Sequence, residues 1–162
     1  MRRVVATLAA AVVAVTALAG VPAGAAGEVD SCGLLTRKEI TQAFGQRARA
    51  GDDDLIEGVC QWRLKRSDVR SPGQVNAMVI RGGDARAQFT LAQSLFSESN
   101  VAIDGLGREA LYSSESGVVW VLVDNQTAFY VQGNVYDADA NRITDGLQDT
   151  LTALAEKAEA RL

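Results

Sequence analysis

The chain has 162 residues, with 16 basic side chains, 20 acidic side chains and no histidine. This length is typical of a single domain, and the lack of histidine excludes Ser-His-Asp and Cys-His nucleophile activation and nearly all zinc sites. The net charge of −4 argues against nucleic acid and anionic membranes as partners, because binding to phosphates needs clustered lysines and arginines.

Residues 1–25 have the composition of a secretory signal peptide. Two arginines are followed by an uncharged run of mainly Ala, Val and Leu from residue 4 to residue 21, and a proline and the small residues Ala23-Gly24-Ala25 come next. We therefore predict cleavage before Ala26 and a mature domain of residues 26–162, which retains 14 basic and 20 acidic side chains. The alternative is an uncleaved membrane anchor, because a run of about 18 apolar residues is at the lower limit for crossing a bilayer.

Both cysteines, Cys32 and Cys60, lie in the predicted mature domain. An even number of cysteines in an exported chain indicates a disulfide, and two cysteines allow one pairing. Neither follows a Leu-Ala-Gly-like triplet, so no lipid anchor is predicted. The bond would close a loop of about 29 residues and remove roughly 3.6 kcal/mol of unfolded-chain entropy.

The first elements after Cys32 are predicted to be a helix and a hairpin. Thr36-Arg37-Lys38-Glu39 is a capping box, which predicts a helix from about Arg37 to Phe44 that ends at a glycine. A polar turn is expected at Gly51–Asp54. From Cys60 the pattern alternates, with apolar side chains on one face and Gln61, Arg63 and Lys65 on a solvated basic face. After a Ser-Pro-Gly turn, a second strand from Val75 to Ile80 completes the hairpin.

The second half of the chain repeats this order. A helix is predicted from about Ala85 to Glu98, followed by a short strand at Leu111-Tyr112. Val118 to Val123 is apolar throughout, as in a strand covered on both faces. Phe129 to Tyr136 forms the next strand, and an amphipathic helix ends the chain.

These elements predict an α+β domain with the order helix, hairpin, helix, hairpin group, helix. The expected architecture is a single antiparallel sheet of about five to seven strands, with three helices packed on one face and one disulfide.

Two motifs resemble cofactor or metal sites. Gly105-Leu106-Gly107-Arg108-Glu109-Ala110 matches the dinucleotide fingerprint, with Asp124 near the acidic position, but a strand is expected where a dinucleotide site needs a helix, so we predict a turn. Residues 137–141 resemble the start of a calcium loop, but Arg142 replaces the required glycine and Gln148 the required glutamate. No cofactor or metal is predicted.

The aromatic residues suggest a candidate ligand surface. Trp62 is expected to cover the disulfide, and Trp120 is assigned to the core or, alternatively, to a binding surface. Alternation along the strands makes Tyr112, Tyr130, Asn134 and Tyr136 the candidate ligand-facing residues.

Short motifs give the chain a family resemblance. Cys32-Gly33-Leu34-Leu35-Thr36, Glu39 and Cys60-Gln61-Trp62 resemble the signature C-x-L-L-T-x-x-E … C-x-W of small actinobacterial exported proteins and lipoproteins catalogued as domain of unknown function 3558. Residues 105–110 are similar to the family's G-L-G-x-E-A turn. The resemblance implies an α+β domain with Cys32 bonded to Cys60 in the cell envelope or outside it, and it implies no activity.

The predicted function is a non-enzymatic binding or interaction module, secreted or associated with the cell envelope. Its binding surface would be the exposed sheet face or the loops around Gly105, and its partner an envelope or extracellular protein, a lipid or a small ligand. One alternative is a secreted hydrolase that uses paired carboxylates such as Asp104 and Glu109. Another is a protease inhibitor with a rigid loop beside the disulfide.

Overall fold

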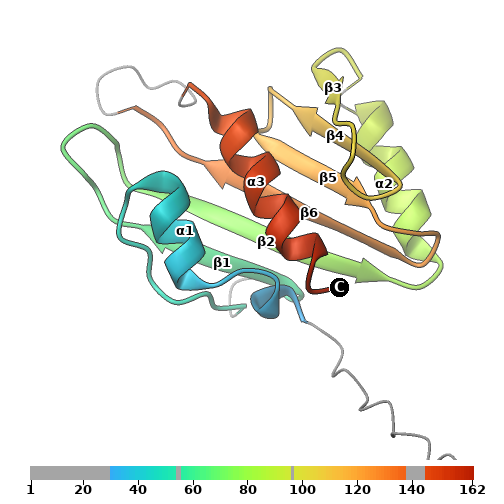
Figure 1. Cartoon of the computed structure of the whole chain (residues 1–162), viewed down its shortest axis with the longest axis horizontal. Helices are drawn as coiled ribbons and strands as arrows, with labels where there is room; N and C mark the ends of the chain where they lie inside the picture. The colour runs from blue at the N-terminus through green and yellow to red at the C-terminus, as the bar shows by residue number, and fades with distance from the viewer. Residues whose placement is uncertain (1–29, 54–55, 96, 138–144) are drawn as a thin grey trace, which may run out of the picture.

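A computed structural model describes residues 30–53, 56–95, 97–137 and 145–162; the predicted signal peptide lies outside them. In these residues six strands form one antiparallel sheet in the order β1-β2-β6-β5-β4-β3 (Figure 1). The predicted α+β class, single antiparallel sheet and three helices are confirmed. The strands are β1 (Val59–Leu64), β2 (Gly73–Arg81), β3 (Asn100–Ala102), β4 (Glu109–Ser113), β5 (Val118–Leu122) and β6 (Thr127–Asn134).

The first helix begins and ends where the capping box predicts. The Thr36 hydroxyl accepts a hydrogen bond from the Glu39 N–H at 3.3 Å, and the Glu39 carboxylate accepts one from the Thr36 N–H at 2.8 Å. Gly45, with a φ of 63°, ends the helix because glycine adopts this left-handed conformation without strain. The helices are α1 (Arg37–Phe44), α2 (Asp84–Leu95) and α3 (Leu147–Glu159), preceded by the 3₁₀ turn η1 (Ser31–Gly33).

The predicted disulfide is confirmed and joins the start of the domain to β1. Cys32 in η1 is bonded to Cys60 in β1. Beside the bond, the Ser31 hydroxyl accepts a hydrogen bond from the N–H of Val79 at 3.0 Å. The chain before α1 is therefore tied to the edge half of the sheet.

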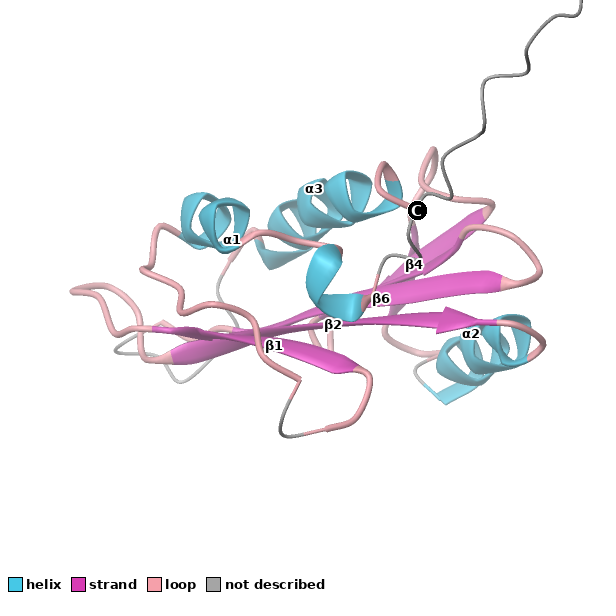
Figure 2. Ribbon diagram, turned by 90° about the horizontal axis from the view of Figure 1, so that it is seen from below, coloured by secondary structure: helices cyan, strands magenta, loops and turns pink. Residues whose placement is uncertain are grey.

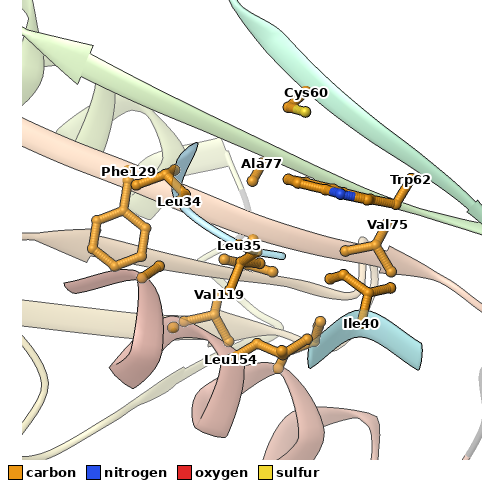
Figure 3. Close-up of a cluster of buried hydrophobic side chains, with 14 of the residues drawn as sticks. Leu34, Leu35, Ile40, Cys60, Trp62, Val75, Ala77, Val119, Phe129 and Leu154 are labelled. Carbon is orange, nitrogen blue, oxygen red and sulfur yellow. The ribbon is translucent and has the colours of Figure 1, made fainter. Parts of the chain in front are cut away.

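The main core lies between the sheet and the helices α1 and α3 (Figures 2 and 3). Trp62 and Val75 are register partners on β1 and β2, and both are fully buried beneath these helices. On β6, Gly133 lets α3 approach closely, since a Cβ atom there would lie 3.0 Å from the Leu147 side chain. The pairing of β2 with β6 joins the first hairpin to the last strand and makes one continuous core.

The expectation that all helices pack on one face is wrong. Helix α2 lies on the face opposite α1 and α3 (Figure 2), where Phe89 packs with Leu111 and Leu122 in a second cluster. The physical reason is the apolar character of β5 on both of its faces, which requires cover on both sides.

The predicted polar turn at Gly51–Asp54 is wrong in its described part, because this segment continues alongside β1. Asp52 and Gln61 exchange two backbone hydrogen bonds of 3.1 and 2.8 Å, and the Arg49 N–H donates to the Arg63 carbonyl at 2.9 Å. The segment therefore covers the free edge of β1. Strand β3 was not predicted, since its three residues are too short for a periodic pattern.

In the part of the chain that is described, no helix is long and apolar enough to cross a membrane.

Candidate functional site

The candidate site lies on the face of the sheet that carries α2. It is the half of this face that α2 does not cover, and we call it the open face. Side chains on this side of the sheet change from apolar to polar in successive rows across the strands. Leu122 and Ala128 lie opposite each other and are buried with α2. None of the described helices covers the next rows, which lie toward the C-terminal end of β1 (Figure 2). Apart from Asn76, which is buried, the side chains of the polar rows are at least partly exposed on that side.

An aromatic pair forms the row next to α2. Trp120 and Tyr130 are register partners on β5 and β6, and their ring centroids lie 4.9 Å apart. Both side chains are half-buried. Burial raises the pKa of the Tyr130 hydroxyl, so that this group stays neutral near pH 7 and can donate a hydrogen bond.

Three amides form the next row, which we call the amide row: Gln61, Asn76 and Gln132, register partners on β1, β2 and β6. Gln61 Nε2 donates to Asn76 Oδ1 at 3.2 Å, and Asn76 Nδ2 donates to Gln132 Oε1 at 3.2 Å. Gln132 Nε2 then donates to the Ser116 carbonyl at 3.1 Å. Each amide carries two N–H donors, so both half-buried glutamines keep donor and acceptor capacity toward solvent.

Two arginines lie at the β1 edge of the row that follows the amide row. Arg49 lies beside Arg63 at the edge of β1, as their 2.9 Å backbone hydrogen bond shows. Arg63 is the register partner of Gln74, which in turn is the partner of Asn134. Because neighbouring strands place opposite side chains about 5 Å apart on one face, these four residues form one polar row.

This row opens into a hollow of about 700 Å³, which we call the basic hollow. Four basic side chains line it: Arg49, Arg63, Lys65 and Arg66, all of them exposed. Tyr136 contributes an aromatic wall, and none of its described lining residues is acidic. Within the described part of the chain, none of the four basic groups forms an ion pair. The hollow therefore concentrates positive charge on an acidic protein.

The structure brings together three of the four predicted ligand-facing residues. Tyr130 and Asn134 lie on the open face, and Tyr136 lines the basic hollow. The assignment of Tyr112 as ligand-facing is wrong, because Tyr112 is buried in the core on the α1 and α3 side. Its neighbour Leu111 packs beneath α2, and alternation along β4 then directs Tyr112 to the opposite face.

The basic hollow was only partly visible in the sequence. The alternation that predicts a solvated basic face on β1 identifies Arg63 and Lys65. Arg49 was missed because its segment was not expected to run beside β1, and Arg66 lies after the end of the strand. The overall negative charge of the chain also concealed this local excess of positive charge.

The glycine motif is a turn, as predicted. Gly107 has a φ of 58°, and its residues lead into β4, not into a helix. A Cβ atom at Gly107 would lie 2.6 Å from Val121 Cγ1 and 2.8 Å from the Leu122 carbonyl oxygen. The glycine is therefore needed because the turn passes close to the backbone of β5.

The loops around Gly105 form a second hollow, of about 510 Å³, which Asp104 and Glu109 both line. Glu109 forms an ion pair with Arg86, and Asp104 is exposed. The carboxylate-dependent hydrolase stays a prediction.

Two other predicted features reach beyond the described residues. Asp137 is described, but the rest of the calcium-like segment, residues 138–141, is not. Within the described residues no three Asp, Glu or Cys side chains are grouped as metal ligands. The loop beside the disulfide includes residues 54 and 55, which also lie outside, so the inhibitor hypothesis stays a prediction.

No protein family model, curated protein or solved structure matches this chain. The resemblance to domain of unknown function 3558 therefore stays a prediction, and the site is interpreted from its own geometry.

Proposed function

We propose that this protein is an exported, non-enzymatic binding module that recognises a small hydroxyl-rich ligand on its open face. The observation that carries the proposal is the amide row: the side chains of Gln61, Asn76 and Gln132 are joined across three strands, and Gln61 and Gln132 are partly exposed beyond α2. A ligand hydroxyl both donates and accepts hydrogen bonds, and so does a carboxamide. The two kinds of group are complementary.

The surroundings of the amide row support a pre-formed site. The row is built on three paired strands and not on loops, so its side chains are held at fixed spacing. Asn76 is buried, and its hydrogen bonds to Gln61 and Gln132 restrict the rotamers of both. Rigid donors and acceptors lose little conformational entropy when a ligand binds.

Export is supported by two independent features. The disulfide between Cys32 and Cys60 is typical of oxidising compartments, and residues 1–25 have the pattern of a signal peptide. The resemblance of the segment around Cys32 to an exported actinobacterial family points to the same compartment.

The binding surface is tested by titrating the purified protein with neutral disaccharides, namely maltose, cellobiose and sucrose. We expect at least one to shift the side-chain amide NMR signals of Gln61 and Gln132 and to change the fluorescence of Trp120. Gln132→Leu should weaken that binding about tenfold, the effect of losing one to two good hydrogen bonds. Gln88→Leu, on the exposed side of α2, is the matched control and should bind normally.

Ligand-induced shifts that map elsewhere, or a Gln132→Leu variant that binds as well as the control, would contradict the proposal. Export is checked separately, by fractionating cells and determining the N-terminus of the recovered protein, which should begin at or next to Ala26. A protein found in the cytosol with free thiols would contradict that part.

A further inference from the structure

We propose that the basic hollow binds a phosphate group, and that the ligand of the open face is a soluble hydroxylated phosphate such as a sugar phosphate. This inference rests on the proposed function and adds the chemical class of the ligand. It starts from the charge of the hollow, where Arg49, Arg63, Lys65 and Arg66 converge without an acidic lining residue in the described chain.

The cluster is unusual for its context. The chain as a whole has a net charge of −4, and the predicted mature part is more acidic still. Elsewhere in the described chain Arg86 pairs with Glu109 and Arg161 with Glu39. The four cations of the hollow have no such partner among the described residues. Their mutual repulsion is relieved when an anion binds between them.

The number and kind of cations favour phosphate over carboxylate. Four positive charges exceed what a single carboxylate neutralises, whereas a phosphate monoester carries close to two negative charges near pH 7. Three of the four cations are arginines, whose planar guanidinium groups bind phosphate oxygens through two parallel N–H donors. Arg63 is also oriented, because its Nε donates to Gln61 Oε1 at 3.3 Å, while its terminal nitrogens have no partner among the described residues.

The amide row places the hydroxyl-binding groups next to the cations. Gln61 is two residues before Arg63 on the same face of β1. The amide row is therefore adjacent to the arginine row, which consists of Arg49, Arg63, Gln74 and Asn134. Gln74 and Asn134 continue the arginine row across β2 and β6 and line the hollow. A ligand whose phosphate lies among the arginines therefore extends its hydroxyl groups over carboxamides. The volume of about 700 Å³ accommodates a molecule the size of a monosaccharide phosphate.

The test is a calorimetric and NMR titration at constant ionic strength with four probes: glucose 6-phosphate, inorganic phosphate, glucose and sodium acetate. We expect glucose 6-phosphate to bind most tightly and to shift the guanidinium signals of Arg63 and Arg66. Arg63→Gln and Arg66→Gln should each weaken binding about tenfold. Arg37→Gln removes the same charge from exposed α1, on the other side of the sheet, and should leave binding unchanged.

The outcomes separate this inference from the proposed function. Glucose binding as tightly as glucose 6-phosphate, with Arg63→Gln unaffected, overturns the phosphate assignment but leaves recognition at the amide row intact. Acetate binding as tightly as the phosphates overturns the choice of phosphate over carboxylate. A last arm uses phosphatidylcholine vesicles containing phosphatidylinositol, and a preference for these vesicles over glucose 6-phosphate overturns the assignment to a soluble ligand. No binding by any probe overturns both proposals.

Discussion

Residues 49–52, which pair with the free edge of β1, form the edge segment, and Gly51 allows this segment to pack on the disulfide because it has no side chain. A Cβ atom at this position would lie 2.6 Å from Cys60 Sγ and 2.7 Å from the Trp62 ring, both of which are buried. The indole and the sulfur are thus neighbours beneath the same backbone, in agreement with the expectation that Trp62 covers the disulfide.

Gly51→Ala should therefore destabilise the protein by about 1–3 kcal/mol, the usual effect of overpacking a filled core. Urea unfolding followed by tryptophan fluorescence measures the difference. Gly83→Ala is the matched control, since no atom lies within 4 Å of its added Cβ, and it should be neutral or slightly stabilising. Equal stability of the two variants would show that the edge segment does not pack on the disulfide.

Glu39 makes the free energy of unfolding depend on pH in the acidic range. The hydrogen bond from Arg161 is the largest effect on its carboxylate, and with the bonds from Thr36 it outweighs burial and lowers the Glu39 pKa from 4.5 to about 2. A carboxyl with a lowered folded-state pKa stabilises the folded protein fully above its unfolded value of 4.5. This contribution is lost as the pH falls toward 2.

Glu39→Gln tests this effect because glutamine can still complete the capping box. We expect the variant to be less stable than the parent by about 1.5–3 kcal/mol at pH 7, the range for a hydrogen bond to a charged group. The difference should shrink as the pH falls below 4.5 and be lost below about pH 2, as chemical denaturation across this range would measure. A difference that does not change with pH would mean that the charge of Glu39 has no role.

Among the elements, α2 has one side buried against the sheet and one side exposed. Phe89 is 2% exposed and packs on the sheet, whereas Leu91, two residues later, is 49% exposed. Phe89→Ala should cost about 3–4 kcal/mol of unfolding free energy. Leu91→Ala, on the same helix, should cost less than about 1 kcal/mol. Similar losses for the two variants in urea unfolding would contradict the position of α2 on this face.

Local sequence signals predicted most elements but not the side of the sheet on which each helix packs. The capping box at Thr36 determines α1 through contacts within four residues, so it is readable from the chain alone. The side taken by α2 depends on which face of β4 and β5 remains apolar after α3 has packed, a long-range condition. The edge segment around Arg49 has neither a periodic pattern nor a hydrophobic stripe, and its backbone pairing with β1 was therefore not predicted.

The same difference between local and long-range signals applies to the candidate site. Alternation along β6 places Tyr130 and Asn134 on one face, and this much was predicted. The basic hollow combines side chains from the edge segment, β1 and the chain that follows it, and their convergence depends on strand register. Tyr112 was misassigned because a two-residue apolar signal does not define which side of a strand faces the core.

At the scale of the whole molecule, the disulfide is the main covalent constraint on the unfolded chain. Cys32 and Cys60 are separated by 28 positions, and the described residues contain no free cysteine. Reduction should lower the unfolding free energy by about 3–4 kcal/mol, the loop-entropy value for this separation. Urea unfolding with and without a phosphine reductant measures the change. A change of less than about 1 kcal/mol would mean that the loop is already restricted in the unfolded state.

The contact between the last residues and the first turn of the domain has a consequence for biogenesis. Arg161 donates a hydrogen bond to the carbonyl of Leu34, 127 positions earlier, and β6 must pair with β2 before the sheet is continuous. A polypeptide that threads through a translocation channel from its N-terminus exposes both thiols long before β6 emerges. In the export proposed above, Cys32 and Cys60 can therefore be oxidised before β6 is available to pair with β2, and the contact between Arg161 and Leu34 forms only after residue 161 has emerged.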